Sequence, residues 1–230
     1  LCNAARSEAD LGKLAARLNP TVRRPSVSRG LSMEALFRVA FWLVFGWMIA
    51  VQAYFACRAR LLEGRATGTR TTIKREGWGY TAARAVRSLS LVVFLVLYAI
   101  NLPWLGMLWV PFPDWLRWMG VGLATVSCVV YAWSRATLGK EWSSRLQTRE
   151  QHRLVTSGPY AWMRHPIYAA LMGFLSGLAL VTANWFFIAI FVLSAVDLIL
   201  RIPKEERMMI EKFGEEYKAY MQRRGRFFPR

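Results

Sequence analysis

The chain has 230 residues, of which 55% are hydrophobic and 14% are aromatic. This composition is too apolar for an ordinary soluble domain, and several runs approach the roughly 20 apolar residues that a helix needs to cross a bilayer. The formal net charge of +17 does not indicate nucleic-acid binding, because no recognised binding motif accompanies it. Two histidines and three scattered cysteines predict neither a disulfide framework nor a metal site.

Residues 1–32 form a polar, basic stretch without a methionine, and a hydrophobic run starts directly after Met33. We therefore expect Met33 to be the natural start and residues 1–32 to be an upstream extension. The alternative is a genuine disordered or targeting N-terminus. Beyond it we expect three membrane helices over residues 33–134 and a catalytic region over residues 135–230.

The predicted fold is an all-α polytopic membrane protein with about five transmembrane helices. The first three are expected at about 35–57, 88–110 and 115–136, the fourth at 166–183, and the fifth from there to about 201. Only Thr182, Ala183 and Asn184 separate the last two apolar runs. Helices four and five should therefore form a hairpin.

The basic residues predict the orientation of these helices. Long basic loops follow the first and third helices, and the positive-inside rule places both in the cytoplasm. The active site and the C-terminus then lie on the cytoplasmic face, and the N-terminus lies outside.

The C-terminal stretch is too polar for a further span. Pro203 stands where a helix can restart, Glu205 and Glu206 would occupy its first turn, and basic residues enrich its end. An apolar stripe at helical spacing predicts an amphipathic helix that either lies at the cytoplasmic interface or packs over a site. The stripe comprises Met208, Met209, Phe213, Tyr217 and Tyr220.

Polar residues concentrate in two patches, 152–168 and 201–206. The predicted hairpin brings the start of helix four beside the end of helix five, so the two patches should be neighbours. Taken singly, Arg164 and Arg201 could be interfacial anchors, and His165 a satisfied interface histidine. Together, so many ionisable groups at one membrane end favour a functional site. Such a pocket suits a polar cytosolic cofactor that meets an apolar substrate.

The sequence "HRLVTSGPYAWMRHPIY", with "RIPKEE" and "FGEEYKAY" further on, resembles the isoprenylcysteine carboxyl methyltransferase family. The wider group includes the phospholipid methyltransferases. The resemblance covers about residues 135–225, including "LGKEW" at 138–142. Many members have glycine two residues after the tyrosine of the R-H-P-x-Y motif, where this chain has Ala170. A small residue still permits close helix packing there.

This resemblance implies S-adenosylmethionine as the cofactor. The cofactor-binding residues expected from it and from the polar patches are His152, Arg153, Leu154, Val155, Gly158, Pro159, Tyr160, Arg164, His165, Pro166, Ile167, Tyr168, Glu205 and Glu206. The resemblance also implies that Arg201 would meet the substrate carboxylate, while Glu205 would bind the cofactor. Arg201 and Glu205 are therefore the expected catalytic residues.

The implied reaction is direct methyl transfer to a prenylcysteine-like or other lipophilic carboxylate, which needs alignment and exclusion of water rather than a general base. The expected partners are this lipophilic or prenylated substrate and membrane lipids, without an obligate protein partner. One alternative is a lipid amine acceptor, which would require a base. The others are a reductase using NADPH, similar to sterol reductases, and a lipid-binding protein without enzyme activity.

Overall fold

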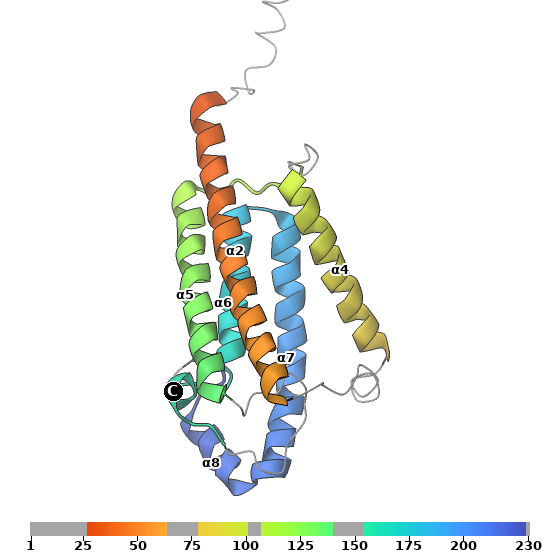
Figure 1. The fold of residues 1–230 in the computed structure, drawn as a ribbon, viewed down its shortest axis with the longest axis vertical. Coiled ribbons are helices and arrows are strands. Elements are labelled where there is room, and N and C mark those ends of the chain that lie inside the picture. The colour runs from red at the N-terminus through yellow and green to blue at the C-terminus, as the bar shows by residue number, and fades with distance from the viewer. Residues whose placement is uncertain (1–26, 64–77, 101–106, 140–153, 229–230) are drawn as a thin grey trace, which may run out of the picture. The chain divides into compact units, whose positions relative to one another are not determined.

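The regular structure of the described residues consists mainly of helices, drawn in Figure 1 from a computed structural model. The structure describes residues 27–63, 78–100, 107–139 and 154–228. In chain order the helices are α2 (Val27–Glu63), α4 (Trp78–Ile100), α5 (Asp114–Leu138), the 3-10 helix η3 (Gly158–Ala161), α6 (Pro166–Thr182), α7 (Trp185–Phe213) and α8 (Glu215–Arg223).

The chain divides into two units, Leu1–Phe37 and Arg38–Arg230. In the first unit, the described residues are the beginning of α2. Most of the predicted extension, residues 1–26, lies outside the described residues. All of the described residues of the candidate site belong to the second unit.

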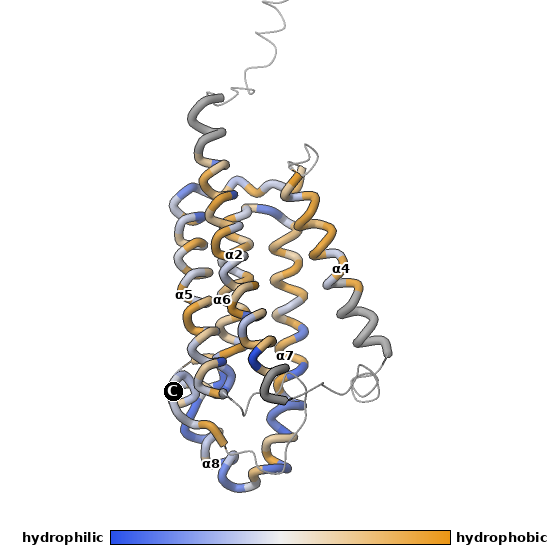
Figure 2. The backbone as a smooth tube through the Cα atoms, viewed as in Figure 1, coloured by the Kyte–Doolittle hydropathy of each residue, from blue (hydrophilic) through white to orange (hydrophobic). Residues whose placement is uncertain are grey.

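Three helices in the described residues are long and apolar enough to cross a membrane: Met33–Ala59, Asp114–Leu138 and Trp185–Phe213. Two shorter apolar helices cover Ser88–Ile100 and Pro166–Thr182. The all-helical prediction is thus confirmed for the described residues. Figure 2 shows hydrophobic residues along the helices of the bundle and hydrophilic residues at the end formed by α8 and the last turns of α7.

α5 and α6 pack closely because small residues face each other between them. A Cβ atom on Gly177 would lie 2.7 Å from the carbonyl oxygen of Gly120 and 2.8 Å from the backbone nitrogen of Ala124. A Cβ atom on Gly173 would lie 2.4 Å from Oγ of Ser127. Such close approach of backbones is typical of helix pairs in membranes.

α6 and α7 form the predicted hairpin, with only Ala183 and Asn184 between them. Ala183 adopts a left-handed conformation with φ 46°, and the Asn184 side chain caps α7 by accepting a bond of 2.9 Å from the N–H of Phe186. A residue outside the hairpin also stabilises the turn, because the N–H of Val110 donates to the carbonyl of Ala183 at 2.7 Å. The buried Arg117 donates through Nε to the carbonyl of Val181 at 3.0 Å.

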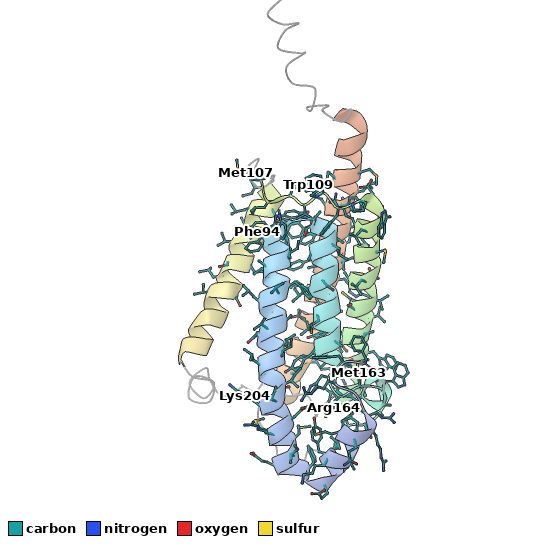
Figure 3. The ribbon with its side chains drawn as sticks, turned by 180° about the vertical axis from the view of Figure 1, so that it is seen from behind. Phe94, Met107, Trp109, Met163, Arg164 and Lys204 are labelled. Carbon is teal, nitrogen blue, oxygen red and sulfur yellow. The ribbon has the colours of Figure 1, made fainter. Side chains whose placement is uncertain are left out.

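An aromatic cluster joins α2, α4 and α7 within the second unit. The rings of Phe94 and Phe186 stack at 3.7 Å between centroids. Phe41 makes edge contacts with Tyr98 at 5.0 Å and with Phe187 at 5.4 Å. Figure 3 shows Phe94 at the end of the bundle that also holds Met107 and Trp109, opposite the end that holds Met163, Arg164 and Lys204.

The predicted bounds of the second helix, about 88–110, are wrong at both ends, because α4 spans Trp78–Ile100. Residues 109–113 contain two prolines, Pro111 and Pro113, which remove helix-forming N–H donors. The backbone of this segment instead bonds to the α6–α7 turn, where Trp109 forms a bridge with Asn184.

The predicted helix restart at Pro203 is also wrong. α7 continues through this proline to Phe213. An interior proline removes one backbone bond, but the Arg201–Glu205 pair spans it on the same helix at 2.9 Å, and Ile202 is buried one residue before it. The break comes at Gly214, whose φ of 56° glycine adopts without a steric penalty.

Candidate functional site

The two polar patches lie against each other, as the hairpin predicted. Residues at the start of α6 contact residues near the end of α7: Tyr168 bonds to Glu205, and both Arg164 and His165 pair with Glu206. In Figure 3, Arg164 and Lys204 lie at the same end of the bundle. The site therefore sits where the apolar helices give way to polar surface.

Glu205 is the centre of the first of two side-chain groups. Its Oε1 accepts a hydrogen bond from the hydroxyl of Tyr168 and a second from Nε of Arg201 at 2.9 Å. The Tyr168 ring stacks on the ring of His165, with centroids 5.6 Å apart and planes 4° apart. The side chains of Arg201 and Glu205 keep 21% and 19% of their surface exposed. This group is therefore open to a ligand.

Glu206 is the centre of the second group and is nearly closed off, with 5% of its side chain exposed. Its Oε1 lies 3.2 Å from Nη1 of Arg164 and 3.4 Å from Nε2 of His165. Its Oε2 accepts a bond of 2.9 Å from Nη2 of Arg226. A buried carboxylate needs such compensation, because burying an unpaired charge is costly.

Gly158 begins η3 and is required by two constraints. Its φ is +58°, and a Cβ atom there would lie 2.7 Å from Oγ1 of Thr137 in α5. The next residue, Pro159, is buried. Gly158 thus brings the start of η3 against the end of α5.

Helix α8 contacts η3 through a buried tyrosine. The hydroxyl of Tyr220 donates to the carbonyl of Tyr160 at 2.6 Å. Burial raises the pKa of Tyr220 to about 12, although the guanidinium groups of Arg164 and Arg224 oppose this shift. Burial also raises the pKa of Tyr160 and of Tyr217. These phenols therefore stay neutral, and keep their capacity to donate hydrogen bonds, above the pH of about 10 at which an exposed tyrosine ionises.

The structure brings most of the predicted residues into one region but not into one role. Tyr168, Arg201 and Glu205 form the open group, whereas Arg164 and Glu206 are paired with each other. Half-buried or buried positions of the same region are held by Leu154, Val155, Gly158, Pro159, Tyr160, His165, Pro166 and Ile167. His152 and Arg153 lie outside the described residues.

Two residues with contacts to the site were missed in the sequence. Arg226 reaches Glu206 from the C-terminal segment, and Tyr220 reaches the loop that begins with η3. The predicted apolar stripe contained Tyr220, and one of its two interpretations was packing over a site, but the individual contact with Tyr160 was not predicted. For Arg226 the only signal was the cluster of basic residues at the end of the chain.

The arrangement is suited to binding and alignment. Its partly exposed carboxylate can accept hydrogen bonds from hydroxyl groups, and its guanidinium can bind a charged end. Its flat ring faces can contact a planar base, so the group fits a nucleoside-like ligand. In the part of the chain that the structure describes, no group of three or more histidine, cysteine or acidic side chains could hold a metal ion.

Comparison with known proteins finds similarity to one family model over part of the chain. The model of the isoprenylcysteine carboxyl methyltransferase family matches residues 109–211. A protein-S-isoprenylcysteine O-methyltransferase of Xenopus laevis is 26% identical over 195 residues, which are 78% of this chain and 62% of that protein. The cobalt-zinc-cadmium resistance protein CzcN of Cupriavidus metallidurans is 33% identical over 99 residues, or 42% of this chain and 45% of that protein.

The fold also resembles a solved structure, that of the eukaryotic intramembrane Ras methyltransferase, an isoprenylcysteine carboxyl methyltransferase. The TM-score is 0.55 at 24% sequence identity, and the match covers 83% of this chain and 67% of the other. This chain spans less than two thirds of the length of the two curated relatives above. Residues 109–211 are thus similar to the isoprenylcysteine carboxyl methyltransferase family, in line with the resemblance of the motifs.

Proposed function

We infer that this chain is an integral membrane methyltransferase that uses S-adenosylmethionine to methylate the carboxylate of a lipophilic, prenylcysteine-like substrate. The observation that carries the proposal is the contact between the R-H-P-x-Y stretch of α6 and the glutamate pair of α7, at the polar end of apolar helices. The family match over residues 109–211 supports it.

The open group around Glu205 fits the proposed cofactor. Its carboxylate is a hydrogen-bond acceptor for hydroxyl groups, and 19% of its side chain is exposed. The closed group around Glu206 has a supporting role, because the Arg164 and Glu206 side chains keep only 9% and 5% of their surface exposed. It holds Arg164 and His165 in place beside the open group.

S-adenosylmethionine, when bound, supplies an electrophilic methyl group. Arg201 orients the acceptor carboxylate by a charge-assisted bond, and its bond to Glu205 fixes the direction of the guanidinium. The carboxylate is already ionised at neutral pH, so no residue has to remove a proton. The protein's contribution is alignment and the exclusion of water.

The contacts of Glu205 favour a carboxylate acceptor over a lipid amine. An ammonium group would have to lose a proton to a base before methylation. Glu205 is the partly exposed carboxylate that could act as this base, but it already accepts hydrogen bonds from both Tyr168 and Arg201. Accepting a proton would disrupt at least one of these bonds.

We extend the proposal to the membrane topology. The two shorter apolar helices, Ser88–Ile100 and Pro166–Thr182, cross the membrane together with the three longer ones, which gives five spans. The site faces the cytoplasm, as the basic loops require. The lipid tail of the substrate reaches the site sideways, between helices. A reporter fused to the C-terminus should show activity in the cytoplasm, which tests the topology.

The deciding experiment is binding of labelled S-adenosylmethionine and NADPH to the purified protein in detergent. We expect saturable binding of S-adenosylmethionine and none of NADPH; the opposite result would favour a reductase, and binding of neither a lipid-binding protein. Methylation of a farnesylcysteine analogue should then give a product that releases labelled methanol in alkali. An alkali-stable product would instead indicate an amine acceptor.

A further inference from the structure

The C-terminal segment Arg224–Phe228 lies along the loop that precedes α6. Gly225 forms a parallel bridge with Met163. The N–H of Arg164 donates to the carbonyl of Gly225 at 2.9 Å, and the N–H of His165 donates to the carbonyl of Arg226 at 3.0 Å. The backbone of the R-H pair is therefore bonded to the end of the chain.

The side chain of Arg226 makes a second connection to the same place. Its Nη2 donates to Oε2 of Glu206 at 2.9 Å, and its Nε donates to Oε1 at 3.4 Å. Such contacts through two nitrogens fix both the position and the rotation of a carboxylate. Glu206 in turn pairs with the side chains of Arg164 and His165. Arg226 thus holds His165 directly through its backbone carbonyl, and it holds both Arg164 and His165 indirectly, because its guanidinium binds Glu206.

The exposed fractions of the Glu206 and Arg226 side chains indicate how the two groups are arranged relative to solvent. Glu206 keeps 5% of its side chain exposed and Arg226 keeps 52%. The guanidinium therefore caps the closed group from the solvent side. Without this cap, water gains access to Glu206, and the carboxylate loses the contacts that set its rotation relative to Arg164 and His165.

We propose that Arg226 is a positioning residue of the methyltransferase site, which orders Arg164 and His165 for cofactor binding without contacting the cofactor itself. The inference rests on the proposed function, since it assigns the R-H pair to the cofactor site. It also makes the C-terminal segment, beyond the family match at residues 109–211, part of the site's architecture.

The test compares four full-length proteins in detergent: the wild type, Arg226→Ala, Arg226→Lys and Arg223→Ala. Arg223 is the matched control, an exposed arginine at the end of α8. Each protein is titrated with S-adenosylmethionine by calorimetry, and its thermal melting point is recorded. Hydrogen exchange of the peptide that contains Arg164 and His165 is measured in parallel.

We expect Arg226→Ala to raise the dissociation constant for S-adenosylmethionine about tenfold, as loss of a charge-assisted bond does, and to speed exchange at Arg164 and His165. Lysine lacks the planar fork that reaches both carboxylate oxygens, so Arg226→Lys should recover only part of the affinity. Arg223→Ala should match the wild type.

Equal affinities for Arg226→Ala and Arg223→Ala would overturn the inference. The inference would also be overturned if Arg226→Lys lost as much affinity for S-adenosylmethionine as Arg226→Ala and if the loss of affinity followed the fall in melting point. Such a result would reflect general destabilisation of the protein. A wild type that binds no S-adenosylmethionine would overturn the proposed function and this inference with it. That failure is distinguishable, since it appears before any variant is compared.

Discussion

Two adjacent glutamates with the same side chain have different surroundings in this protein. Successive residues on a helix point about 100° apart, so Glu205 and Glu206 face different neighbours. Glu205 meets Tyr168 and Arg201 and stays partly exposed, whereas Glu206 is enclosed by basic groups. At the residue scale, their roles therefore follow from helix geometry and from what packs against each face.

Replacing Arg201 by alanine should reduce turnover far more than cofactor affinity. The change removes the group assigned to the acceptor carboxylate, and we expect at least about a tenfold loss of turnover, with a smaller loss of affinity because the Arg201 bond to Glu205 also disappears. Single-turnover assays and calorimetry separate the two. Arg207→Ala, an exposed arginine on the same helix, is the control; equal losses in turnover and affinity for Arg201→Ala would contradict the substrate role.

Glu205→Gln should weaken binding of S-adenosylmethionine by about tenfold, because an amide accepts a hydrogen bond less strongly than a carboxylate. The substitution keeps the side-chain size. Calorimetry on Glu205→Gln beside Glu211→Gln, an exposed glutamate on the same helix, gives the measurement and its control. An unchanged affinity would remove Glu205 from the cofactor site.

At the scale of elements, the α5–α6 contact is the rigid support of the site. Gly120 and Gly177 approach each other so closely that neither position has space for a Cβ atom. α5 also contacts η3 through Thr137 and Gly158, and α6 begins with the R-H-P-x-Y stretch. Separating the two helices would therefore move the ends that carry the site.

Gly177→Ala should destabilise the protein by roughly 1–3 kcal/mol, because the added methyl group meets backbone atoms that cannot rotate away. Gly122 provides the control: it lies on α5, the other helix of the pair, and an added Cβ atom there meets nothing within 4 Å. Gly122→Ala should be neutral or stabilise by up to about 1 kcal/mol. Thermal unfolding in detergent compares them, and equal melting points would contradict the close contact.

At the scale of the whole molecule, the sequence predicted the arrangement of helices better than their ends. The length of the apolar runs and the short turn at Ala183 sufficed to predict the hairpin. The hairpin predicted that the two polar patches would be neighbours, but not the individual contact between Tyr168 and Glu205. The path through Pro203 could not be predicted, because the cost of an interior proline, about 3 kcal/mol, is offset by tertiary contacts. The position of Arg226 depends on the turn at Gly214 and on the direction of α8, which no local pattern specifies.

Stability should fall as the pH rises above about 10. Below that pH the tyrosines are neutral in both the folded and the unfolded states. Above it the unfolded chain releases protons, while Tyr160, Tyr217 and Tyr220 stay neutral in the folded state because burial raises their pKa. Stability is therefore lost progressively from about pH 10 to the folded pKa of Tyr220, about 12.

Melting points recorded between neutral pH and about pH 11 test this expectation. Tyr220→Phe should lower the melting point at neutral pH, through loss of a hydrogen bond worth about 1 kcal/mol, but should reduce the further decline in alkali. If wild type and variant declined in parallel, the titration of Tyr220 would not contribute.

The unbroken course of α7 through Pro203 has a consequence for how this protein can change over evolution. Arg201 and Glu205 share one continuous helix, so the separation between the residue proposed to bind the acceptor and the residue proposed to bind the cofactor is set by helical rise, about 6 Å for four residues. A loop could lengthen by a single residue, but one residue inserted here would turn Glu205 by about 100° away from Tyr168. Length variation in this segment is therefore restricted to steps that restore the helical phase.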